Sequence, residues 1–323
     1  MKADHEKRAT SVPADEANVW QQSFTNQRIV SVGQVGGFSA GTMNFVIAAE
    51  KDPSHGSGLV IAERFVQLFE MHGIHRNQIP RVLGHGLKLA DMRNNDALLD
   101  ALDTDLLKTA SDFFCINPGW LEGAIDEIYP LHDFYKEHDR FERFVCELVS
   151  RANGCTGVVL LAQTNEHEED ALIVIQEPIG ELNSKQIYRY HLCNNWLASY
   201  WKARGYLAAC VAAAWRAHVY LLGRRVPIDR VRELREGKKF LEYVFDNALP
   251  TDGLHWYPED MLVKPEAFLE GVDEGVRGKR LGLQMWLDLE RTGALKTDLP
   301  YSRVRQLFER ALASLNEDED EGH

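Results

Sequence analysis

The sequence predicts an α+β fold that is mostly helical, in which a short helical bundle precedes a larger C-terminal α+β domain with a small antiparallel sheet. Between residues 59 and 121 the apolar residues recur with a helical period. Between residues 156 and 193 they form β-branched and aromatic runs, which favour strands. The helical period then returns and continues to residue 315, so we expect helices to predominate.

The composition is typical of a globular protein in a reducing compartment. The chain has 323 residues, of which 45% are hydrophobic and 26% are charged. No apolar run reaches the roughly 18 residues that a membrane-spanning helix needs, and the polar N-terminus has no signal core. The five cysteines form no CxxC pair, so we expect free thiols and a cytoplasmic protein.

Residues 1–54 are predicted to form a polar arm followed by a β-hairpin. Two β-branched or aromatic runs flank a glycine-rich centre between Gln27 and Glu50. A phosphate-binding loop is the alternative for this centre, but neither GxGxxG nor GxxxxGKS/T is present. The segment KDPSHGSG, which follows, is rich in turn-forming residues and indicates a linker.

Residues 55–127 are predicted to form several short helices joined by tight turns. The first helix has four apolar side chains on one face and ends at Gly73. Gly84 ends a second, shorter helix. A later helix begins near residue 104, where we expect the Thr104 side chain to cap the first turn.

Residues 128–150 are predicted to be a connector that becomes helical near Phe141. An α+β region follows over residues 151–315. We expect its strands to form a three-stranded antiparallel meander over residues 156–163, 170–179 and 185–193.

Helices are expected after the meander, and the acidic residues 316–323 are expected to form a disordered tail. We expect the aromatic side chains of the first of these helices to pack in the core. Two alternatives remain open, because these side chains could line a ligand pocket against the sheet, or the alanines of the helix could form a dimer interface.

Two segments of the helical region match the pattern of a known domain. They are AERFVQLFEMHGIHRNQIPRVLG (residues 62–84) and LLKTASDFFCINPGWLEG (residues 106–123). The second segment matches a closing pattern at Ala110, Phe113 or Phe114, Ile116, Trp120, Leu121 and Gly123. Residues 59–123 therefore resemble the Cro/C1 type of helix-turn-helix domain, the lambda-repressor-like family. The resemblance implies a DNA-binding bundle, in which Pro118 and Gly119 stop a helix and Trp120 and Leu121 close the core.

A basic segment lies between Met71 and Asn95, where a helix-turn-helix domain would face DNA. It has four bases and one acid, Asp91, in a chain of net charge −13. Cations contact phosphates, and amide and guanidinium groups can contact base edges. The candidate DNA-binding residues are Arg76, Asn77, Gln78, Arg81, His85, Lys88, Arg93 and Asn94.

Within this set, we expect Arg76, Arg81 and Lys88 to anchor phosphates. The base-contacting candidates are Gln78, Arg93 and Asn94. The alternative is that these residues lie on an exposed face of the bundle that contacts protein, which would make the chain a non-enzymatic adaptor.

Two further clusters have a less specific pattern. Residues 216–239 contain eight bases against three acids, typical of a solvated helix with intrahelical ion pairs, and a second phosphate-contacting surface is the alternative. Glu168, Asp170 and Glu177 could hold a divalent cation in a metal-dependent nuclease. However, Glu177 is followed by Pro178 and Ile179, where a nuclease of the restriction type needs ExK.

The sequence thus predicts a cytoplasmic, bacterial-type transcription regulator that binds double-stranded DNA sequence-specifically and is not an enzyme. We expect its C-terminal region to form a homodimer or a higher homo-oligomer, and to respond to a small-molecule or protein effector. No cofactor, metal ion or membrane partner is expected.

Overall fold

The computed structural model describes residues 56–163, 170–241, 255–299 and 302–320. The predicted N-terminal arm and hairpin, with Glu168 of the proposed nuclease cluster, lie outside these residues. None of the described helices is long and apolar enough to cross a membrane.

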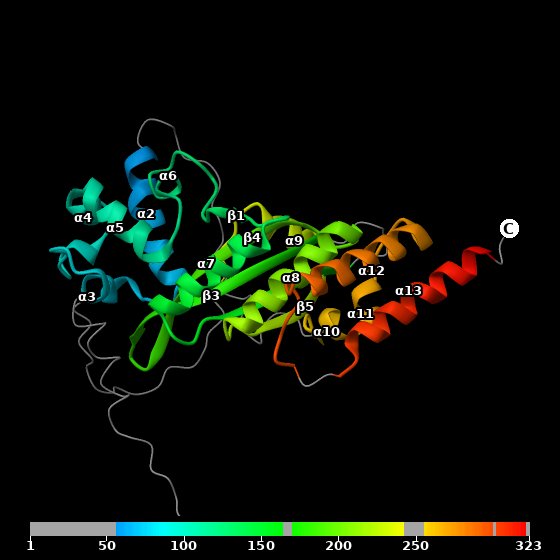
Figure 1. The fold of residues 1–323 in the computed structure, drawn as a ribbon. Coiled ribbons are helices and arrows are strands. Elements are labelled where there is room, and N and C mark those ends of the chain that lie inside the picture. Colours follow the sequence, from blue (N-terminus) through cyan, green and yellow to red (C-terminus); the bar gives the residue numbers. More distant parts are fainter. Residues whose placement is uncertain (1–55, 164–169, 242–254, 300–301, 321–323) are drawn as a thin grey trace, which may run out of the picture.

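A six-stranded mixed sheet forms the centre of the molecule (Figure 1). Its strands are β1 (Leu131–Asp133), β2 (Thr156–Gln163), β3 (Asp170–Leu182), β4 (Lys185–Leu197), β5 (Leu221–Pro227) and β6 (His255–Trp256). Their order is β1-β4-β3-β2-β5-β6. The antiparallel meander predicted from the sequence is confirmed as β2–β3–β4.

The prediction of a small, purely antiparallel sheet is wrong. Strand β5 pairs parallel to β2, and β1 pairs parallel to β4. A strand that lies parallel to its neighbour is reached through a crossover connection. Here the helix α8 (Trp201–Arg216) connects β4 to β5 and brings β5 beside β2. β5 lacks a continuous apolar pattern because Gly223 and two arginines interrupt it. Gly223 is required there, since a Cβ atom would lie 2.3 Å from the Trp256 carbonyl oxygen.

Helices cover both faces of the sheet, so the described chain has three layers (Figure 1). One face is covered by α2 (Gly56–Met71), α3 (Ile79–Leu83), α4 (Asn95–Ala101), α5 (Thr104–Phe114), α6 (Pro118–Leu121) and α9 (Ile228–Arg235). On the other side lie α7 (His138–Arg151), α8, α10 (Asp260–Val263), α11 (Pro265–Leu269), α12 (Gly275–Arg291) and α13 (Val304–Asp320). Of these, α12 packs on α8 and α13 packs on α12, outside the layer that contacts the sheet.

Successive residues of the central strands enter these two cores in turn. Val158 and Val174 contribute to the core under α2–α6, whereas Val159 and Ile173 contribute to the core under α7 and α8. Both faces of β2 and β3 are therefore buried, which explains their nearly continuous apolar sequence. The predicted helical bundle shares its core with the sheet.

The helix-turn-helix arrangement expected from the resemblance is not confirmed. Its second helix consists of a 3-10 turn, η2 (Arg76–Gln78), and the five-residue α3. The segment expected to form the recognition helix contains turns and a second 3-10 turn, η3 (Asp91–Arg93). The backbone explains this, because Gly84, His85 and Gly86 all have positive φ angles, of 71°, 52° and 81°. An α-helix cannot pass through three consecutive left-handed residues.

The predicted closure of the bundle by Trp120 and Leu121 is confirmed, since their side chains are only 5% and 0% exposed. Trp120 also contacts Phe240 edge to face, with ring centroids 5.5 Å apart. Arg64 lies over the Trp120 ring at 5.3 Å. The Trp120 side chain therefore joins the bundle to the segment after α9.

Three predicted details differ from the structure. The cap of α5 is Asp103, whose side chain accepts a hydrogen bond of 2.8 Å from the Leu106 amide, and Thr104 is the first helical residue. Pro118 and Gly119 begin α6, because the preceding helix has already ended at a left-handed Cys115. Helix α13 continues to Asp320, where a disordered tail from residue 316 was expected.

Candidate functional site

The eight candidate DNA-binding residues lie together, between η2 and the start of α4. Figure 1 shows this region at the end of the molecule opposite to α13. The structure separates the eight into residues that hold this region together and residues that project into solvent.

Arg76 belongs to the first group. Its Nε donates to the Met92 carbonyl oxygen at 2.8 Å, and its Nη1 donates to Asn95 Oδ1 at 2.8 Å. Its Nη2 is buried and has no hydrogen-bond partner. The guanidinium thus joins η2 to η3 and α4, and it is not free to anchor a phosphate.

Gln78 and Asn94 are occupied by capping bonds. Gln78 Oε1 accepts from the His75 amide at 2.9 Å in a capping box around η2. Asn94 Oδ1 accepts from the Ala97 amide at 2.8 Å and caps α4. Because each amide oxygen satisfies a helix-terminal N–H group, neither side chain can rotate to a base edge without loss of that cap.

Arg81 contacts the turn between β3 and β4. Its Nη2 donates to Asn183 Oδ1 at 3.0 Å, and its Nε is buried without a partner. Arg81 therefore fixes α3 to the hairpin turn, and only part of its guanidinium faces solvent.

The remaining four candidates, Asn77, His85, Lys88 and Arg93, are exposed. Within the described part of the chain, no side-chain hydrogen bond or ion pair involves Lys88 or Arg93. The single acid of the segment, Asp91, accepts from the Lys88 backbone amide at 2.8 Å. These side chains are therefore the ones available to a partner.

Substitution of Arg76 by alanine is expected to destabilise the fold without changing charge-dependent binding. The variant loses two hydrogen bonds from a charged donor, which costs about 2 kcal/mol of unfolding free energy. Urea denaturation measures this change. Arg93→Ala is the matched control, and it should stay within about 0.5 kcal/mol of the wild type because Arg93 is exposed. Equal stability of the two variants would contradict the structural role of Arg76.

A second polar cluster is buried between the sheet and α7. Glu177 is 1% exposed, and Arg189 donates to both of its oxygens at 2.8 and 2.7 Å. His191 Nε2 donates to Glu177 Oε2 at 2.7 Å. Arg151, at the end of α7, lies 3.7 Å from the same carboxylate.

These contacts determine the charge states within the cluster. Burial acts to raise the pKa of Glu177, but the hydrogen bonds from His191 and Arg189 outweigh it and lower the pKa to about 2. Burial lowers the pKa of His191, against the effect of its bond to Glu177. Near neutral pH the cluster therefore contains a carboxylate, a neutral imidazole and two guanidinium groups.

The neighbouring cysteines have no properties of nucleophiles. Burial raises the pKa of Cys155 to about 11 and also raises that of Cys115. Both are therefore protonated thiols near pH 7, whereas a nucleophilic cysteine is a thiolate with a lowered pKa.

The carboxylates proposed for a nuclease do not converge. Asp170 and Glu177 are seven residues apart on β3, or about 23 Å at the usual rise of a strand. Asp170 pairs with Arg232 at 3.3 Å and with Arg235. Among the described residues, no three His, Cys, Asp or Glu side chains are arranged to hold a metal ion.

The basic segment 216–239 is largely engaged in ion pairs. Arg216 contacts both oxygens of Glu142 on α7, at 2.9 and 2.8 Å. Arg230 forms the expected intrahelical pair, with Glu233 at 3.4 Å. Most of the other pairs connect different elements, which favours a structural role for this segment over phosphate contact.

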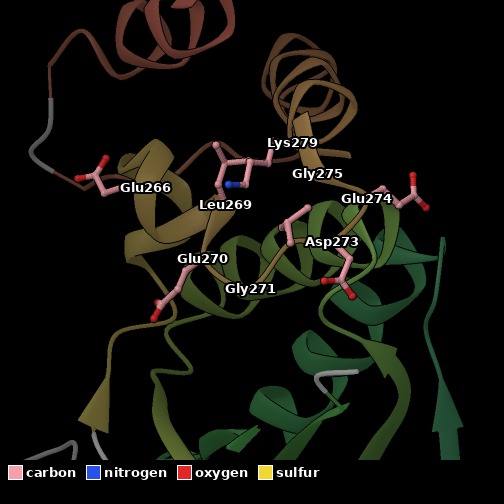
Figure 2. A pocket seen from close by; sticks show the side chains of 9 residues that line it. Glu266, Leu269, Glu270, Gly271, Asp273, Glu274, Gly275 and Lys279 are labelled. Atoms are coloured by element: carbon pink, nitrogen blue, oxygen red, sulfur yellow. The ribbon is translucent and has the colours of Figure 1, made fainter. Parts of the chain in front are cut away.

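The alanines of α8 do not form a free dimer face. Ala208, Ala209, Ala212, Ala213 and Ala214 are all 0% exposed, inside the core of a single chain. A cavity of about 910 Å³ lies elsewhere, beside α11 and α12. Figure 2 shows four acidic side chains around it, from Glu266, Glu270, Asp273 and Glu274. This acidic surface repels phosphate and is remote from the α3–α4 end (Figure 1).

Sequence reasoning missed two features of these sites. One is Leu89, which is 68% exposed in the middle of the basic segment. The other is the Glu177–Arg189–His191 cluster, although the strand pattern contained a signal for it. A two-residue turn at Asn183 and Ser184 places Glu177 opposite Arg189.

Comparison with known proteins finds no matching family model, no matching curated protein and no matching solved structure.

Proposed function

We propose that this chain is a DNA-binding transcription regulator that contacts DNA with the loop between α3 and α4, residues 84–94. The observation that carries the proposal is the pair of exposed cations, Lys88 and Arg93, without an acidic partner in the described structure. They lie at the end of the described molecule that is remote from the acidic cavity, where phosphate meets no repulsion from it.

The structure modifies the roles expected from the sequence. Arg76, Gln78 and Asn94 stabilise the loop, which leaves Asn77 and Arg93 as base-contacting candidates and Lys88 as a phosphate anchor. The DNA-contacting element is thus a loop braced by short helical turns, in place of a recognition helix.

Sequence specificity would depend on a second copy of this loop. A homodimer presents two such loops at a fixed spacing, and this spacing sets the distance between half-sites in the DNA. In this proposal the sheet and α7–α13 form the body that dimerises and responds to an effector.

Substitution of Lys88 by alanine is expected to weaken DNA binding to the same extent for all DNA sequences. Substitution of Arg93 by alanine is expected to weaken DNA binding and also to reduce its sequence specificity. Each loss of a phosphate contact should reduce the slope of log affinity against log salt by about 0.9. Fluorescence anisotropy over a range of salt concentrations measures both quantities. Lys296→Ala is the matched control, because Lys296 is an exposed lysine after α12.

The second candidate function is a protein-interaction adaptor, which the exposed Leu89 favours. The same titration separates the two functions. If the wild-type chain has no salt-dependent affinity for DNA at low ionic strength, the regulator proposal is wrong and the adaptor remains.

A further inference from the structure

Leu89 is a large apolar side chain left uncovered on the loop between α3 and α4. It is 68% exposed, the largest value among the exposed large hydrophobic residues of the described chain. It directly follows Lys88 and lies four residues before Arg93, in the loop that projects from the end of the molecule (Figure 1).

The backbone that carries Leu89 is held firmly. The Met92 amide donates to the Leu89 carbonyl oxygen at 3.2 Å, and Asp91 accepts from the Lys88 amide at 2.8 Å. Met92, only 2% exposed, anchors the turn in the core. Arg76 fixes the Met92 carbonyl oxygen from the other side. The leucine is therefore presented on a fixed turn, and it keeps its orientation without being covered.

We propose that Leu89 is a wedge that inserts between base pairs from the minor groove and bends the DNA. Proteins that bind this groove insert single apolar side chains at a base step while nearby cations hold the phosphates. The loop has both components, Leu89 and the cations Lys88 and Arg93. This inference rests on the proposed function and specifies how the same loop contacts DNA.

The short elements of this region favour the minor groove over the major groove. The major groove is wide enough to admit an α-helix or a two-stranded ribbon. Within the described residues, the segment between α3 and α4 contains only turns and η3. Such a loop fills the major groove less completely than a helix does, but it can present one side chain to a base step in the minor groove.

The neighbours of Leu89 favour DNA over a protein partner. Lysine is depleted from the cores of protein interfaces, and leucine is under-represented among residues that dominate their affinity. An exposed leucine can contact protein, but a lone leucine between cations matches the composition of a wedge more closely than that of a protein-interface core.

The test measures bending and affinity separately, with the full chain. The probe is a duplex of about 30 base pairs with a central TA step, which kinks easily, and with a fluorescence donor and acceptor at its ends. Wild-type protein should increase energy transfer. Leu89→Ala should abolish that increase in energy transfer. It should also weaken binding about 10- to 100-fold, which is the effect of losing one buried leucine. The slope of log affinity against log salt concentration should not change, because no phosphate contact is lost.

Two variants serve as controls. Leu89→Met keeps an apolar wedge and should retain bending. Leu307→Ala removes another exposed leucine, on α13, and should leave bending and affinity unchanged. Thermal unfolding of all variants checks that the fold is intact.

The outcomes separate this inference from the function on which it rests. If wild type and Leu89→Ala bend DNA equally, or if neither bends it while Lys88→Ala still weakens binding, the wedge is wrong and the DNA-binding proposal stands. If the wild-type chain binds no DNA at low salt, both proposals are wrong.

Discussion

Replacement of Arg189 by methionine is expected to lower the free energy of unfolding by about 3–5 kcal/mol. The substitution leaves the Glu177 carboxylate buried without its bidentate partner. Arg151, at 3.7 Å and half exposed, cannot replace two hydrogen bonds of 2.7 to 2.8 Å. Chemical denaturation at pH 7 measures the loss.

A double variant distinguishes the interaction from simple loss of packing. Glu177→Leu combined with Arg189→Met removes both charges, and it should recover part of the stability, because an apolar pair of similar volume is often as stable as a buried ion pair. The recovery is incomplete, since the buried His191 Nε2 loses its acceptor, Glu177 Oε2. Arg291→Ala is the control for a solvent-exposed pair, since Arg291 and Asp288 are both largely exposed. It should change stability by no more than about 1 kcal/mol. A cost for Arg189→Met as small as this control would contradict the assigned role.

The pH dependence gives an independent measurement of the same pair. The folded pKa of Glu177 is about 2, below its ordinary value of 4.5. A lowered carboxylate pKa stabilises the fold above pH 4.5, and this stabilisation, about 3 kcal/mol, is lost as the pH falls towards 2. In Arg189→Met the carboxylate keeps the hydrogen bond from His191 but loses both bonds from Arg189, so the acid-induced loss should move to higher pH.

Local periodicity was sufficient to predict the strands of the central meander and most of the helices. Successive residues of β2 and β3 enter two cores, so the sequence shows a nearly continuous apolar run, whose β-branched residues predict a strand. The parallel pairs were not predictable in the same way. β2 and β5 are separated by two strands and a helix, so their pairing leaves no local pattern.

The sequence shows where the basic residues of the candidate site cluster, but not which contacts they make. The charge of the basic segment is a property of composition, so the sequence shows it directly. The partner of Arg81, in contrast, is Asn183, 102 residues away. The bond from Arg76 to the Met92 carbonyl oxygen depends on the turns at Gly84 and Gly86. The tertiary structure therefore determines which basic side chains are left without a hydrogen-bond or ion-pair partner in the described chain.

His72, at the end of α2, is expected to lower the stability of the fold in acid. His72 is 8% exposed and packs on the Phe114 ring at 4.1 Å. Its Nδ1 donates to the Leu68 carbonyl oxygen at 2.7 Å, which leaves Nε2 buried and without a hydrogen-bond partner. Burial lowers the pKa of His72 from 6.5 to about 4, against the effect of the Leu68 bond.

This lowered pKa makes the fold sensitive to acid. Below pH 6.5 the unfolded chain binds a proton at His72 and the folded chain does not, so stability falls as the pH decreases and the loss is complete near pH 4. The expected loss from this residue is about 3 kcal/mol. Burial also lowers the pKa values of His132 and His191, which add to the loss in the same direction.

Comparison of the wild type with His72→Leu isolates the contribution of this residue. The variant loses one hydrogen bond, so at pH 7 we expect it to be less stable by about 1 kcal/mol. Between pH 6.5 and 4 its stability should decrease less steeply, and the two curves should cross. His255→Leu, which removes an exposed histidine on β6, should retain the slope of the wild type. If the two curves of unfolding free energy against pH are instead parallel for His72→Leu and the wild type, protonation of His72 does not cause the loss of stability in acid.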